Sequence, residues 1–122
     1  MFEGSAILIG KEMPTINNSK SRDGPLVYVC SPFRGDTRNN IEKAKSYSRF
    51  VVDHGAIPLT PHLLLPQFMD EATERELAME MDLFFLSKCD QLWAFGTERS
   101  DGMKAEMAEA KRLGIPIIFM EE

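Results

Sequence analysis

The sequence has few of the features that mark specialised binding proteins. Of its 122 residues only Cys30 and Cys89 are cysteines, and they stand far apart without the spacing of a metal site. We therefore expect two buried free thiols in a reducing compartment, with the cytoplasm as the default location. Walker loops, GxGxxG motifs and clusters of metal-ligating residues are also missing. The sequence thus predicts no bound metal and no organic cofactor.

Long apolar runs and an excess of positive charge are absent too. No stretch is long enough to span a bilayer, and the apolar run at residues 6–9 is too short for a secretion signal. The net charge is −5, from 19 acidic and 14 basic side chains, and no basic stripe is visible. These features argue against a membrane or nucleic-acid partner, and they leave room for a small anion held by one local arginine.

Short apolar runs alternate with helical patterns along the chain. The expected strands are residues 26–30, 56–59, 91–95 and 115–119. The expected helices are residues 38–53, 73–87 and 100–113. This alternation predicts an α/β fold, a Rossmann-like or flavodoxin-like three-layer sandwich with a mostly parallel sheet of four to five strands. Pro58 predicts an edge or a strand end for the second run.

Residues 1–24 differ from the rest of the chain. They are polar and turn-rich toward Gly24, and we expect a flexible tail or, through residues 6–9, an edge strand. Residues 25–122 are expected to form one domain, because that length suffices for a core without disulfides or metals.

Two apolar segments suggest contacts beyond simple packing. The segment 60–70 is expected to be a loop that covers the sheet, or else a lid or an oligomer contact. Residues 77–86 are apolar nearly all round, which predicts a helix buried on more than one side. We therefore expect a homo-oligomer, a dimer or larger.

The carboxyl ends of parallel strands form the usual ligand site of such a sheet. Three segments fall at that edge: the loop 31–36, the loop around His62 and the turn 96–102. Arg34 and Ser31, placed beside the turn, predict an anion site there, because arginine binds phosphate bidentately and hydroxyl and backbone N–H groups complete its shell.

Two acidic residues interrupt apolar helical faces. Glu106 shares a helical stripe with Met103 and Ala110, and Asp82 lies inside the apolar segment 77–86. Buried carboxylates are costly unless they are paired, so one interpretation is an acid pair for glycosidic chemistry. The other is that Glu106 is solvated or caps a neighbouring loop. Tyr28 likewise is either a core residue or a hydroxyl at the rim.

Four segments together resemble the nucleoside 2-deoxyribosyltransferase-like superfamily. They are YVCSPFRGD at 28–36, PHLLLPQF at 61–68, CDQLWAFG at 89–96 and SDGMKAE at 100–106. The sequence is similar to the branch that hydrolyses 2′-deoxynucleoside 5′-monophosphates, and more similar still to a group of bacterial and phage domains with these same segments. The resemblance extends from about Leu26 to Phe119.

The resemblance implies a role for each matching residue. Glu106 would be the nucleophile, and Asp82 would hold the sugar and orient the nucleophile. The expected substrate-binding residues, including His62 and Met103 beside the matched positions, are Tyr28, Ser31, Arg34, Gly35, His62, Ser100, Gly102 and Met103. A surface role is the alternative for His62, which is a lone histidine in its loop.

The implied function is cleavage or transfer of the N-glycosidic bond of a (deoxy)nucleoside or nucleoside 5′-monophosphate, without a cofactor. Two alternatives stay open: a nucleotide-binding module of the same fold, and an interaction protein that kept only the fold. Lys104 stands where the family often has a second glycine, and we expect it to crowd the sugar or to contact phosphate. Phe33, after Pro32, is expected to narrow or reshape the base pocket.

Overall fold

A computed structural model describes residues 23–120 of the chain. Its elements follow in the order β1 (Leu26–Cys30), α1 (Thr37–Asp53), β2 (Ile57–Leu59), α2 (Pro61–Leu64), η3 (Leu65–Gln67), α3 (Arg75–Ser87), β3 (Gln91–Phe95), α4 (Asp101–Leu113) and β4 (Ile117–Met120). The tail or edge strand expected within residues 1–22 lies outside the described residues.

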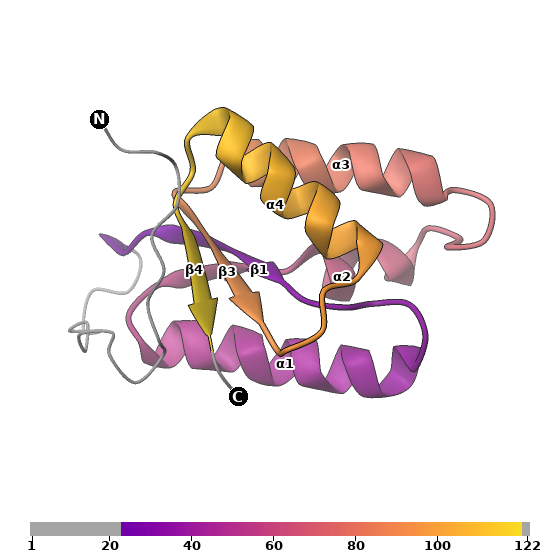
Figure 1. Ribbon diagram of the computed structural model, residues 1–122. Helices are drawn as coiled ribbons and strands as arrows, with labels where there is room; N and C mark the ends of the chain where they lie inside the picture. Colours follow the sequence, from indigo (N-terminus) through magenta and orange to yellow (C-terminus); the bar gives the residue numbers. More distant parts are fainter. Residues whose placement is uncertain (1–22, 121–122) are drawn as a thin grey trace.

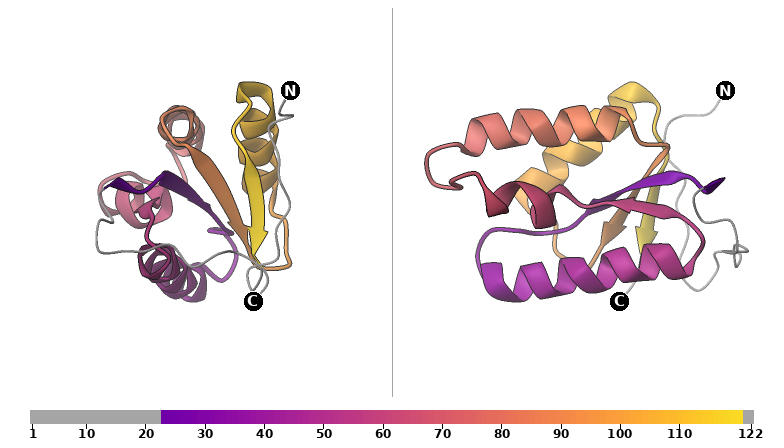
Figure 2. Two further views of the ribbon diagram at one scale, coloured as in Figure 1. Left: turned by 90° about the vertical axis from the view of Figure 1, so that its left-hand side faces the viewer. Right: turned by 180° about the vertical axis from the view of Figure 1, so that it is seen from behind.

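The four described strands form one parallel sheet in the order β2-β1-β3-β4. Helix α1 covers one face of this sheet, and α3 and α4 cover the other (Figure 1; Figure 2). The predicted α/β three-layer architecture is therefore confirmed. Pro58 lies in β2, at an edge of the sheet, as its missing N–H group predicted.

Alternate strand residues build two separate cores. The side chains on the α1 face are apolar and include Val27, Val29, Trp93, Phe95 and Ile118. Those on the α3 and α4 face include Tyr28, Cys30, Leu92, Ala94 and Ile117. Burial on both faces explains why the strands read as continuous apolar runs. Both cysteines are buried and free, as predicted.

The ends of α4 agree with the helix expected at residues 100–113. Ser100 is the N-cap, and its Oγ accepts a hydrogen bond of 3.2 Å from the backbone N–H of Met103. Gly114 ends the helix in the left-handed conformation, with φ at 76°. These caps fix the helix that carries Glu106 relative to the end of β3.

Two expectations about the apolar segments are wrong. Residues 60–70 contain α2 and η3 rather than only a loop. Pro61 suits the first position of a helix, and Leu65, at the start of η3, is buried. Helix α3 is not buried on several sides within one chain, since Leu77 is 45% and Phe84 60% exposed. The homo-oligomer remains a prediction. None of the described helices is long and apolar enough to cross a membrane.

Candidate active site

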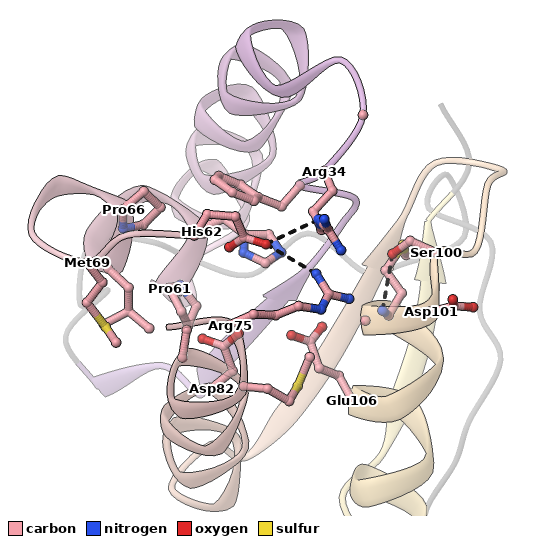
Figure 3. Close-up of a pocket in the computed structure, with 18 of the residues that line it drawn as sticks. Arg34, Pro61, His62, Pro66, Met69, Arg75, Asp82, Ser100, Asp101 and Glu106 are labelled. Carbon is pink, nitrogen blue, oxygen red and sulfur yellow. Dashed lines mark hydrogen bonds and ion pairs between the residues drawn. The ribbon is translucent and has the colours of Figure 1, made fainter. Parts of the chain in front are cut away.

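A cavity of about 360 Å³ opens at the carboxyl end of β1, between the loop that follows it, α2, and the first turns of α3 and α4 (Figure 3). Most of the predicted site residues line it: Arg34, Gly35, His62, Asp82, Ser100, Gly102, Met103 and Glu106. Tyr28 and Ser31 are not among the lining residues, although both contact residues that are. The structure thus brings together residues from four separate segments.

Glu106 lies on the inner face of α4 and is only 1% exposed. Its Oε2 accepts a hydrogen bond of 2.8 Å from the hydroxyl of Tyr28 on β1. Its Oε1 is buried and has no hydrogen-bond partner within the described residues. A buried carboxylate oxygen without a partner is costly, so Glu106 is held on one side and left unsatisfied on the other.

Asp82 is the second buried acid of the pocket and comes from α3. Its Oδ1 is likewise buried without a hydrogen-bond partner in the described part of the chain. Figure 3 shows the side chains of Asp82 and Glu106 directed into the same space. The solvated or capping role that was the alternative for Glu106 is therefore wrong.

Burial raises the pKa of both acids. Burial is the largest of the influences that together bring the pKa of Glu106 to about 8; the hydrogen bond from Tyr28 lowers it, the charge of Asp82 raises it and the nearby Cys30 thiol lowers it. For Asp82, burial and then the charge of Glu71 raise the pKa to about 7. Two carboxyl groups that exchange protons near neutral pH in one cavity are typical of acid–base or nucleophilic sites.

The loop after β1 holds Arg34 at the mouth of the cavity. The side-chain amide of Asn40, in α1, donates to the carbonyl oxygens of Phe33 at 3.2 Å and Arg34 at 3.1 Å. Gly35 has φ at +95°, and a Cβ there would contact nothing, so glycine is required for its backbone conformation. The hydrogen bonds from Asn40 therefore hold the loop against α1, and the loop turns sharply at Gly35.

His62 and Phe33 form one wall of the cavity. Their rings lie 5.1 Å apart, tilted by 34°. The Nε2 of His62 donates to the carbonyl oxygen of Ser31 at 3.0 Å, since a carbonyl can only accept. Burial lowers the pKa of His62, so the ring is neutral at pH 7. The hydroxyl of Ser31 is buried without a partner in residues 23–120.

The sequence analysis missed several residues that line the cavity, among them Glu71, Arg75 and Met79. Arg75 and Met79 stand seven and three residues before Asp82, on the same helical face, and this spacing was a usable signal. Glu71 gave none, because it lies in a polar turn before α3. Its carboxylate pairs with Arg75 and, across the cavity mouth, with Arg34.

The start of α4 and the turn before it agree only in part with the expectations. Lys104 is exposed and is not a lining residue, so it neither crowds the cavity nor contacts its interior. Gly102 lies in the first turn of α4, where a Cβ would come within 3.6 Å of the Cε atom of Met79. Residues 96–98 instead border a second hollow of about 560 Å³ beside α1.

The described residues, 23–120, contain no group of three His, Cys, Asp or Glu side chains arranged to hold a metal ion. The cavity is lined by carboxyl, guanidinium, imidazole and apolar groups.

Residues 25–120 match the family described as Domain of unknown function (DUF7768). The chain belongs to this family. Among solved structures, it is similar to a 2-deoxyribosyltransferase from the psychrotolerant bacterium Bacillus psychrosaccharolyticus, with a TM-score of 0.59 and 19% identity. That similarity covers 79% of this chain and 72% of the other. It establishes the fold implied by the resemblance. No curated protein matches the chain.

Proposed function

We propose that the protein cleaves or transfers the N-glycosidic bond of a nucleoside or nucleoside 5′-monophosphate, with Glu106 as nucleophile. The observation that carries this proposal is the state of Glu106: one oxygen is held by Tyr28, and the other is buried, unpartnered and beside the cavity. Such an oxygen is fixed in direction and lacks a competing hydrogen bond, which is what attack on a bound sugar requires.

The reaction would proceed by double displacement. The Oε1 of Glu106 bonds to the anomeric carbon through an oxocarbenium-like transition state, and the glycosidic C–N bond breaks with its electrons going to the base nitrogen, which takes up a proton. Water, or a second base, then attacks the anomeric carbon and releases the Glu106 carboxylate. Asp82 would accept a hydrogen bond from a sugar hydroxyl through its free Oδ1.

The walls of the cavity suit the two ends of such a substrate. Phe33 and His62 offer ring faces on which a base can stack. Arg34, at the mouth, offers a guanidinium group for an anionic substituent. The structural neighbour, a 2-deoxyribosyltransferase, supports a transfer reaction as one outcome.

A second candidate function is a nucleotide-binding module without turnover. The observation that favours it is the pKa of Glu106, which burial raises to about 8, so that most of the side chain is protonated at pH 7. A protonated carboxyl group is a hydrogen-bond donor and a poor nucleophile. Enzyme and binding module therefore predict different pH behaviour.

The deciding experiment is an assay of base release. The full chain would be incubated with deoxynucleosides, ribonucleosides and their 5′-monophosphates, with and without a second base, and free base would be followed by chromatography. Because the carboxylate is the attacking form, we expect release to rise with pH until about 8. Glu106→Gln should reduce it by roughly 10³-fold or more.

The control is Glu109→Gln, on the same helix, because Glu109 pairs with Arg112 and does not line the cavity. This variant should keep the activity of the wild type. If no base is released under any condition while a nucleotide raises the melting temperature, the binding module replaces the enzyme. Equal release by wild type and Glu106→Gln would exclude Glu106 as the nucleophile.

A further inference from the structure

Two arginines from distant parts of the chain converge on one carboxylate oxygen at the mouth of the cavity. The Oε2 of Glu71 lies 3.3 Å from the Nε of Arg34, in the loop after β1, and 3.2 Å from the Nη1 of Arg75, at the start of α3. Figure 3 shows both guanidinium groups directed toward the centre of the cavity, with dashed lines to this oxygen. A single oxygen thus serves two cations.

This cluster is open to exchange with solvent. The side chains are 61%, 43% and 38% exposed for Arg34, Arg75 and Glu71, respectively. Exposed ion pairs contribute little stability, because water competes for both partners. Glu71 also lies in a turn before α3 rather than within the helix. Its carboxylate can therefore leave the two arginines without loss of the fold.

The charge of Glu71 reaches the interior of the cavity. After burial, it is the next cause that raises the pKa of Asp82, and it also acts to raise the pKa of His62, which burial lowers. Five carboxyl groups line the cavity together with the two arginines. Since carboxyl groups repel an anion, the place in the cavity where an anionic ligand can bind is beside these arginines, and Glu71 already holds that position.

We propose that Glu71 is a displaceable occupant of a phosphate site, and that Arg75 joins Arg34 in binding the phosphate monoester of a nucleoside 5′-monophosphate once Glu71 has moved out. The identity of the rest of this ligand rests on the proposed function. A phosphate monoester carries up to two negative charges on three oxygens, so it satisfies both guanidinium groups better than one shared carboxylate oxygen does.

This arrangement makes Glu71 a specificity residue. A nucleoside leaves the Arg34–Glu71–Arg75 cluster intact and gains nothing from it. A nucleotide must compete with Glu71, and it then gains two charge-assisted contacts. Removal of the charge of Glu71 should therefore strengthen nucleotide binding while nucleoside binding stays the same.

The test is calorimetric titration of four deoxynucleoside 5′-monophosphates and their four nucleosides. A Glu106→Gln background prevents turnover during the titration. Glu71→Gln should raise the nucleotide-to-nucleoside affinity ratio about tenfold, and Arg75→Gln should lower it about tenfold. Matched controls are Glu80→Gln, exposed on α3, and Arg38→Gln, exposed on α1, neither of which lines the cavity. Both should leave the ratio within about twofold of the background protein.

A ratio that stays unchanged or falls in Glu71→Gln overturns the proposal, as does an equal gain for nucleosides. If nucleosides bind too weakly to give a ratio, inorganic phosphate at constant ionic strength is the probe. Phosphate should raise the melting temperature of Glu71→Gln more than that of Glu80→Gln, and an equal response overturns the proposal. The assay of base release distinguishes the proposed function from the proposed phosphate site. If base is released but the affinity ratio is unchanged in Glu71→Gln, only the proposed function stands. If the affinity ratio rises but no base is released, only the phosphate site stands.

Discussion

The two faces of the sheet are built from the same strands and serve different ends. On the α1 face, the rings of Tyr47 and Phe95 stack 4.4 Å apart, and Phe50 meets Trp93 edge to face. That face belongs to an apolar, aromatic core. The face under α3 and α4 combines an apolar core with two buried acids, each with one oxygen that lacks a hydrogen-bond partner among the described residues. One face is closed by packing, while the other leaves polar groups to be satisfied by a ligand.

Strand β1 shows this division residue by residue. Val27 and Val29 face α1, and Tyr28 and Cys30 face α3 and α4. Tyr28 is as deeply buried as its valine neighbours, yet its hydroxyl ends on Glu106. The ring of Tyr28 thus belongs to the core, while its hydroxyl group donates a hydrogen bond within the site. Stability and chemistry are thus separated by the alternation of a single strand.

The largest effect on stability is expected when the aromatic core on the α1 face is disrupted. Trp93→Ala removes a fully buried ring from the α1 face, and we expect the free energy of unfolding to fall by about 3–5 kcal/mol. Urea unfolding followed by circular dichroism measures it. Trp93→Phe, which keeps most of the apolar volume, should cost less. Nucleotide affinity of Trp93→Ala, measured in conditions where the variant is folded, should change little. A loss of stability under 1 kcal/mol would refute the role given to this face.

On the other face of the sheet, replacement of a buried acid should increase stability instead of lowering it. The unfolded chain deprotonates Glu106 near its ordinary pKa of 4.5, while the folded chain keeps the proton until about 8. The stabilising contribution is full below 4.5 and is lost as pH rises through 8. Glu106→Gln cannot deprotonate, so its free energy of unfolding does not show this fall. Between pH 6 and 9 we therefore expect the free energy of unfolding of the variant to rise by roughly 3 kcal/mol relative to that of the wild type. Denaturant unfolding at several pH values measures it, and a difference independent of pH would contradict the raised pKa.

The sequence allowed the fold and the two acids to be predicted for the same reason. Asp82 and Glu106 are charged residues in apolar helical patterns, and such misfits are visible without a structure. The helix expected at residues 100–113 closely matches α4, because its caps, Ser100 and Gly114, depend on local backbone chemistry. Local rules were enough wherever a residue's environment is set by its own element.

Features that depend on distant contacts could not be predicted in this way. Glu71 lies in a polar turn and gave no signal in the sequence, and it meets Arg34 only because the fold brings the two residues together across the cavity mouth. The exposure of Phe84 is a similar case. An apolar helix surface has the same pattern whether it packs within the chain or against a partner. Periodicity identifies an apolar face, and tertiary structure decides what covers it.

The two tyrosines of the chain allow the finest test, because one serves each face. Tyr28→Phe removes the hydrogen bond to Glu106 and leaves Oε2 unpaired, at a cost of about 1–2 kcal/mol. This hydrogen bond lowers the pKa of Glu106, so its loss should extend the pH-dependent fall in stability above pH 8. Tyr47→Phe changes the opposite face and should leave that pH dependence unaltered. The test is to measure the free energy of unfolding of both variants between pH 6 and 10. If the two variants shift the pH dependence equally, the faces are not separate, and Glu106 is not governed by Tyr28.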